Sequence, residues 1–200
     1  MKKITLLTVL AFLLINSMVI HGQTAYVPND NGNGNATLSV VDLGTQTTIE
    51  TISIGTSPEA IAISSDESKL YLSNPAEGTI SILETATNSI VETIDIGITH
   101  SIYGIDLSPD DQLLYVLLFQ TSELIIVDLN DLTISDPIST GTGPAYITAS
   151  PDGEKVYFSN HYAESIGVLE TENNTVEATI AIPDDSPLEM EISPDNSKVY

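Results

Sequence analysis

The sequence contains no cysteine, no tryptophan and no arginine. Without cysteine, no disulfide framework and no lipid-modified cysteine is available, so stability has to come from packing. Five basic residues stand against 28 acidic ones, which gives a formal net charge of −23. A field this negative repels nucleic acid, anionic lipid and phosphorylated substrates. The composition therefore excludes these partners and permits neutral or cationic ones.

After about residue 25, the apolar residues also show no helical periodicity. Isoleucine, valine, threonine and tyrosine dominate short segments that are separated by glycine, proline, asparagine, aspartate and serine. β-branched and aromatic residues favour strands, and the separating residues favour turns. The sequence therefore predicts an all-β protein with short strands.

What the chain does have is a repeat, visible in four copies of one turn segment. The copies are Ser64-Ser65-Asp66, Ser108-Pro109-Asp110, Ser150-Pro151-Asp152 and Ser193-Pro194-Asp195. Their spacings are 44, 42 and 43 residues, and a tyrosine follows each copy at a fixed distance. A period of this length indicates one supersecondary unit per copy.

Each unit reads as four strands. In the second unit they are expected at residues 59–64, 69–74, 79–84 and 89–96. Repeated four-stranded units predict a β-propeller of antiparallel blades, each about 43 residues long; a regular β-sandwich is the alternative. In the turn Ser150-Pro151-Asp152-Gly153, glycine suits a left-handed backbone. Glu67, Asp111 and Asn196 replace that glycine elsewhere, so those turns are expected to differ.

Two strand segments carry a family resemblance, Lys69-Leu70-Tyr71-Leu72-Ser73-Asn74 and Lys155-Val156-Tyr157-Phe158-Ser159-Asn160. They resemble the "VYVTN" strand of the YVTN-repeat β-propeller family, and residues 84–94 resemble that family's next hairpin. The third unit departs, because Val116-Leu117-Leu118-Phe119 lacks the Ser-Asn pair. The resemblance covers about residues 25–200. It implies a seven-bladed propeller in a secreted or surface-layer protein, and little about chemistry.

The chain is expected to consist of a signal peptide followed by a propeller region. The signal peptide is expected at 1–22, and the propeller region, at 23–200, contains a partial blade 25–55, blades 56–98, 99–141 and 142–185, and a partial blade 186–200. Seven such blades need on the order of 300 residues, so we expect a fragment of a longer propeller. A closed ring of four blades, completed by residues 187–193, is the alternative.

The N-terminus has the pattern of a targeting segment. Met1-Lys2-Lys3 is followed by an apolar run from Ile4 to about Ile15, and Gly22-Gln23 offers a cleavage point. We expect a secreted or extracytoplasmic protein, with no stable membrane span once the segment is cleaved. An uncleaved anchor is the alternative, because the apolar run nearly reaches membrane-spanning length.

The remaining lysines share one repeat position, directly after the turn between the first and second strands of a unit. They are Lys69, Lys155 and Lys198. This position belongs to the disc face formed by the first-to-second and third-to-fourth strand turns, here called the turn face. The opposite face, formed by the other connections and here called the loop face, has acids but no lysine. It is therefore expected to accept neutral or cationic protein or glycan partners.

Candidate site residues are few. The ligand-binding candidates on the loop face are His100, Tyr103, Tyr146, His161 and Tyr162, for which loop packing is the alternative. Asp106 and Glu191 share one first-strand position on the expected central channel, where carboxylates would favour Ca²⁺; solvated channel acids are the alternative. No catalytic residue and no organic cofactor is evident. We expect a non-enzymatic binding or structural module, with an extracellular enzyme or electron-transfer partner as the alternative.

Overall fold

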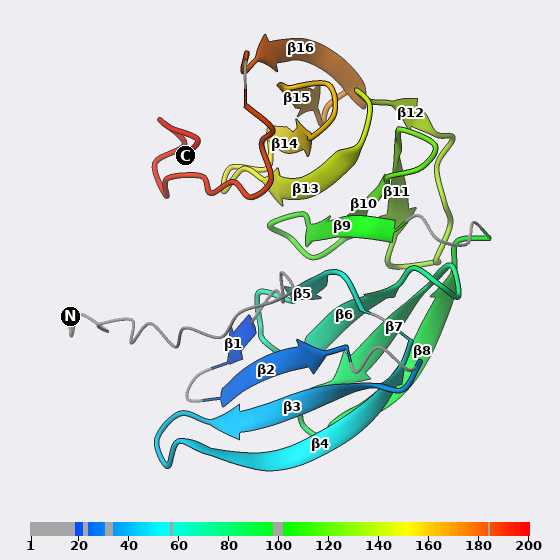
Figure 1. Cartoon of the computed structure of the whole chain (residues 1–200), viewed down its shortest axis with the longest axis vertical. Helices are drawn as coiled ribbons and strands as arrows, with labels where there is room; N and C mark the ends of the chain where they lie inside the picture. The colour runs from blue at the N-terminus through cyan, green and yellow to red at the C-terminus, as the bar shows by residue number, and fades with distance from the viewer. Residues whose placement is uncertain (1–18, 22–23, 31–33, 57, 98–101, 184) are drawn as a thin grey trace.

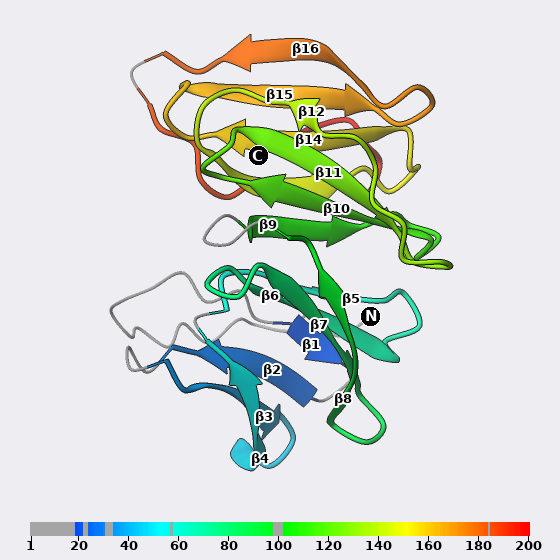
Figure 2. The same ribbon diagram turned by 90° about the vertical axis from the view of Figure 1, so that its right-hand side faces the viewer.

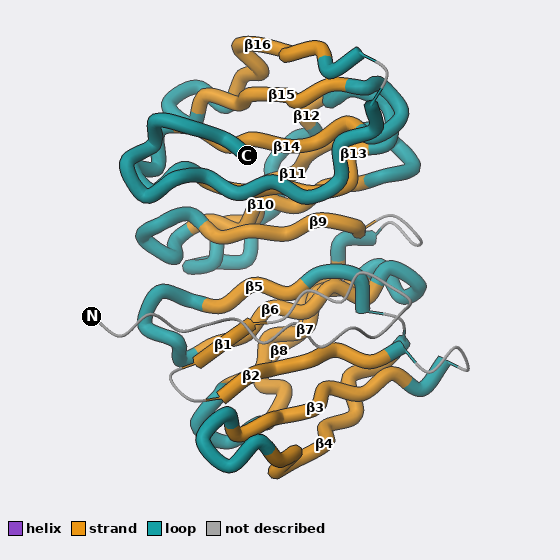
Figure 3. Tube along the Cα trace, turned by 60° about the vertical axis from the view of Figure 1, so that its left-hand side comes forward, coloured by secondary structure: helices purple, strands orange, loops and turns teal. Residues whose placement is uncertain are grey.

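A computed structural model describes residues 19–21, 24–30, 34–56, 58–97, 102–183 and 185–200. Over these ranges the chain forms strands, turns and loops and no helix, as Figure 3 shows. It follows that no helix in the described part of the chain is long and apolar enough to cross a membrane.

The strands form four separate antiparallel sheets of four strands each. The first blade contains β1 (Val19–His21), β2 (Thr24–Asn29), β3 (Ala36–Asp42) and β4 (Thr47–Gly55). The second contains β5 (Ile61–Ile63), β6 (Lys69–Asn74), β7 (Thr79–Glu84) and β8 (Ser89–Asp95). The third contains β9 (Ile102–Leu107), β10 (Leu113–Leu118), β11 (Glu123–Asp128) and β12 (Ile138–Ser139). The fourth contains β13 (Pro144–Ala149), β14 (Lys155–Asn160), β15 (Ser165–Glu170) and β16 (Thr175–Ala181).

The sheets are arranged as an arc of propeller blades. In Figure 1 the first strand of each blade lies on the concave side and the fourth strand lies toward the outside. Figure 2 shows the blades stacked one after another along the arc. Four separate sheets confirm the β-propeller prediction and exclude the β-sandwich, which has two packed sheets.

The first blade contains one strand, β1, that lies outside the partial blade expected at residues 25–55. Strand β1 pairs with β2, with Val19 opposite Tyr26. It lies in the segment predicted to be a signal peptide, whose other residues, 1–18 and 22, fall outside the described ranges. At the other end, Ile192 bridges Val199, and the backbones of Glu191 and Tyr200 exchange two hydrogen bonds. These contacts form the expected first hairpin of a further unit.

The apolar core lies between blades. Each of three buried clusters joins residues of two adjacent sheets. Within the second strand of the second blade, for example, Leu70 packs toward the first blade and Tyr71 toward the third. Both side chains are almost fully buried. This packing explains why the inner strands are apolar on both faces and lack simple alternation.

The turns between first and second strands adopt one conformation, so the expectation that they differ was wrong. Glu67, Asp111, Gly153 and Asn196 have positive φ values of 61°, 57°, 75° and 57°. In each turn their backbone N–H donates to the serine carbonyl at 2.8–2.9 Å. The serine hydroxyl also donates to the aspartate two residues later at 2.6–2.7 Å. These hydrogen bonds hold three non-glycine residues in the left-handed region.

One of these turns is joined to its neighbour by Asp111. The backbone N–H of Ser65 in the second blade donates to the two Asp111 carboxylate oxygens at 2.9 and 3.0 Å, and the Ser65 hydroxyl donates to one of them. We expect Asp111→Asn to lower the free energy of unfolding by about 1 kcal/mol, since hydrogen bonds to charged groups contribute modestly where water competes. Asp136→Asn, on the same blade, should change it by less than about 0.5 kcal/mol. Equal effects of the two variants in urea unfolding would contradict this expectation.

Candidate functional site

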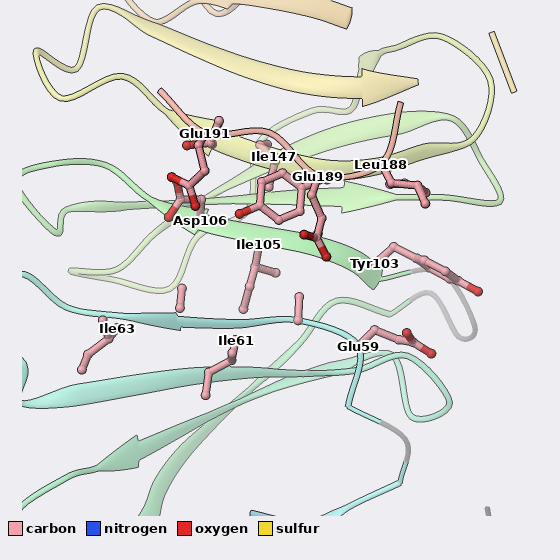
Figure 4. A pocket seen from close by; sticks show the side chains of 16 residues that line it. Glu59, Ile61, Ile63, Tyr103, Ile105, Asp106, Ile147, Leu188, Glu189 and Glu191 are labelled. Atoms are coloured by element: carbon pink, nitrogen blue, oxygen red, sulfur yellow. The ribbon is translucent and has the colours of Figure 1, made fainter. Parts of the chain in front are cut away.

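The inner strands of the blades line a cavity of about 590 Å³ on the concave side of the arc. Strands β5, β9 and β13 and residues 188–191 contribute its walls. Figure 4 shows Glu59, Tyr103 and Leu188 at one end, which is the loop-face end. Asp106 and Glu191 lie at the other end, with their carboxylates close together. The cavity thus lies on the concave side of the arc, where the central channel was expected, and side chains from several units line it.

Register shifts at the loop-face end of the inner strands place aromatic residues in this wall. Between β9 and β10, Leu117 pairs with Gly104 and Leu118 with Ile102, so Tyr103 is an extra residue in the ladder. Between β13 and β14, a similar shift covers Tyr146. Such bulges redirect side chains out of the regular pleat.

A buried serine supports the second bulge. The Ser159 hydroxyl accepts the Tyr146 backbone N–H at 3.0 Å and donates to the Leu188 carbonyl at 2.9 Å. Its counterpart Ser73 accepts the backbone N–H of Ala60 at 2.8 Å. The serine of the repeated strand motif therefore fixes the inner strand of its own blade and, in the fourth blade, also the segment that follows.

Three aromatic side chains on the loop face form a continuous cluster, here called the aromatic ledge. They are Tyr103, Phe119 and Tyr162. The Tyr103 and Phe119 rings stack with centroids 4.4 Å apart, and Phe119 meets Tyr162 edge-on at 5.5 Å. Tyr162 lies against Gly143, where any side chain would collide with its ring. Tyr103 is 36% exposed and Tyr162 is 67% exposed, so the ledge presents aromatic surface to solvent.

Phe119 was not among the residues singled out from the sequence. The signal that could have found it is the departure of the third unit from the Ser-Asn pattern. Leu117 and Leu118 replace that pair and are fully buried. A Cβ on Gly104 would lie 3.1 Å from a Leu117 methyl group, so glycine leaves room for the larger side chain. Phe119 directly follows β10, the second strand of this blade, and stacks on Tyr103.

The channel carboxylates and tyrosine affect one another's ionisation. Burial raises the pKa of Asp106 to about 6, and the charge of Glu191 adds to this effect; backbone N–H groups of Ala149 and Leu107 donate to the Asp106 carboxylate and oppose it. Burial, followed by the charges of Glu191, Asp106 and Glu189, raises the pKa of Tyr146 to about 12. These shifts indicate a partly desolvated, negative wall.

Burial and neighbouring carboxylates also raise pKa values at the loop-face end of the cavity. Burial and the charge of Asp30 raise the pKa of Glu59, and the charge of Glu59 helps to raise the pKa of Tyr103. No lysine or arginine is among the described residues that line the cavity. On the turn face, by contrast, Lys155 forms an ion pair with Glu177.

The structure brings most of the predicted site residues to this region. Tyr103, Tyr146, Asp106 and Glu191 line the cavity, and Tyr162 belongs to the ledge. The His161 ring lies 5.0 Å from the Tyr162 ring, and its Nδ1 atom is buried without a hydrogen-bond partner. His100 falls outside the described residues. In the described part of the chain, no group of three or more histidine or acidic side chains could hold a metal ion.

Comparisons with known proteins support the fold and do not assign a family. No protein-family model and no curated protein sequence matches the chain. Among solved structures, 1400 chains match. One is Kuenenia stuttgartiensis hydrazine synthase, with a TM-score of 0.79, 22% sequence identity and coverage of 89% of this chain. The match spans 51% of that chain, about half its length. At this identity the likeness shows the propeller fold alone.

Proposed function

We propose that this protein is a secreted or cell-surface β-propeller, related to the YVTN-repeat proteins, that binds a neutral or cationic protein or glycan without catalysis. One observation carries the proposal. The cavity and ledge combine exposed aromatic rings with four carboxylates, and no lysine or arginine lines the described part of this surface. Exposed aromatic residues are typical of binding surfaces, and the charge pattern disfavours anions.

A panel of potential partners tests the proposal. It contains a basic protein, an acidic protein, neutral glycans, DNA and a phosphosugar, each measured by calorimetry with and without Ca²⁺. We expect binding of the basic protein or a glycan, with cationic binding weakened as salt rises because exposed charges are screened. Tight Ca²⁺-independent binding of DNA or the phosphosugar would contradict the proposal. So would a panel in which nothing binds.

An extracellular enzyme is the second candidate, and Asp106 favours it. A carboxyl group with a pKa of about 6 beside a second carboxylate is an arrangement that acid–base catalysts of glycan hydrolysis use. Tyr146 lines the same cavity. Release of reducing sugar from a panel glycan, abolished by Asp106→Ala, would replace the non-enzymatic proposal with this one.

A further inference from the structure

We propose that the aromatic ledge and the adjoining cavity end bind an arginine side chain of a basic protein partner. This inference rests on the proposed binding function and specifies its partner class. It uses residues from three blades, namely Glu59 of the second, Tyr103 and Phe119 of the third and Tyr162 of the fourth. No single repeat unit contains this combination.

The aromatic ledge presents exposed ring faces on which a guanidinium group could stack. Phe119 covers one face of Tyr103 by stacking, which fixes the orientation of the Tyr103 ring. Tyr103 and Tyr162 nevertheless stay exposed at 36% and 67%. A guanidinium group is planar and stacks on such rings, and the attraction to the ring grows when water is excluded.

The charges near the ledge favour a cationic ligand. Glu59 and Tyr103 line the same end of the cavity (Figure 4), and the charge of Glu59 adds to the effect of burial in raising the pKa of the Tyr103 hydroxyl. Asp30 in turn disfavours the ionised form of Glu59. Farther into the cavity, Glu189 and Glu191 act on Tyr146 in the same way. A bound cation would relieve these like-charge repulsions, and no basic residue of the described cavity lining does so.

Hydrogen-bonding capacity favours arginine over a neutral glycan. The charged side chains of the lining are Glu59, Asp106, Glu189 and Glu191. When ionised they only accept hydrogen bonds, and the remaining polar side chains of the lining are the hydroxyls of Tyr103, Tyr146 and Thr148. Sugar hydroxyls need acceptors and donors in balance, whereas a guanidinium offers five N–H donors and no acceptor. The acceptor-rich wall thus matches a donor-only ligand.

The test uses an octapeptide of alternating arginine and serine, measured by calorimetry against the full chain at low salt. Its control peptide carries neutral citrulline, which has nearly the same shape as arginine. We expect the arginine peptide to bind at least tenfold more tightly than the citrulline peptide. Tyr103→Leu should weaken arginine binding roughly 3- to 30-fold, the range of one cation–π contact, whereas Tyr103→Phe should stay within about twofold.

Charge variants complete the design. Glu59→Gln should weaken arginine binding several-fold, and Glu172→Gln, in an exposed turn between β15 and β16 on the turn face, should leave it unchanged. Thermal unfolding of each variant checks that the fold is retained. If Tyr103→Leu has lost the fold, Tyr162→Ala, at a more exposed position, replaces it with the same expectation.

The outcomes separate this inference from the proposed function. If the panel's basic protein binds while Tyr103→Leu and Glu59→Gln bind the arginine peptide as wild type does, the ledge inference is wrong and the proposed function stands. Binding of a glycan but not of the arginine peptide overturns the inference in the same way. Equal binding of the arginine and citrulline peptides also overturns it. If nothing in either experiment binds, both proposals fail.

Discussion

Replacement of Gly167 by serine is expected to lower the free energy of unfolding by about 3 kcal/mol, the upper part of the range for overpacked cores. Gly167 in β15 lies directly opposite Phe158 in β14. The Phe158 ring is fully buried and occupies the space where a side chain on residue 167 would begin. The ring also packs in a core cluster with residues of the third blade, so moving it would disturb that packing. Urea unfolding followed by far-ultraviolet circular dichroism measures the loss.

A second substitution should restore part of that stability. In the second blade the equivalent cross-strand pair is Leu72 with Ser81, which shows that leucine and serine fit this position together. Phe158→Leu alone should cost about 1–2 kcal/mol through the volume that it leaves empty. The double variant should therefore be more stable than Gly167→Ser alone. Additive losses would show that the large–small pairing of Phe158 and Gly167 does not determine the packing between these blades.

The second expected result concerns the stability contributed by Asp106 as pH changes. Its pKa in the folded protein is about 6, above the unfolded value near 3.8. Between these values the folded state binds more protons than the unfolded state, so this group makes the free energy of unfolding fall as pH rises. The shift of about two pKa units corresponds to a loss of at most about 3 kcal/mol between pH 4 and pH 7.

Comparison with Asp106→Ala isolates this contribution. The alanine occurs naturally at the equivalent position, Ala62, in the second blade. The variant loses a carboxylate that accepts the Leu107 and Ala149 N–H groups, so its absolute stability can fall. Its stability should nevertheless decrease less than that of the wild type between pH 4 and pH 7. Parallel pH profiles of the two proteins would refute a raised Asp106 pKa.

The aspartates of the turns change the free energy of unfolding in the opposite direction, because their pKa values are lowered in the folded protein. Hydrogen bonds from Ser64 and Ser68 lower the pKa of Asp66 to about 2, and those from Ser193 and Ser197 do the same for Asp195. Their contribution is present above about pH 4 and is lost as pH falls toward 2. Because the Asp106 contribution falls as pH rises above about 4, the three groups together contribute most to the free energy of unfolding between about pH 4 and pH 5.

The repeat in the sequence was sufficient to predict the blades and most strand limits. The expected strands at 69–74 and 79–84 match β6 and β7, because a strand's pattern of apolar residues and its flanking turns are local. The departure of the third unit was also visible, although its consequence for Phe119 was not. The sequence further identified Asp106 and Glu191 as equivalent positions in two units.

The tertiary structure alone decided which of these residues meet. In the aromatic ledge, Phe119 contacts Tyr103, 16 residues earlier, and Tyr162, 43 residues later. Tyr103 reaches the ledge through a β-bulge that neither the composition nor the repeat period predicts. The equal shape of the four turns likewise required hydrogen bonds that outweigh the preference of residues other than glycine for negative φ. A repeat specifies each unit separately, whereas a site between units depends on how adjacent blades pack. That packing depends on paired side-chain volumes, such as those of Phe158 and Gly167, and therefore appears only in three dimensions.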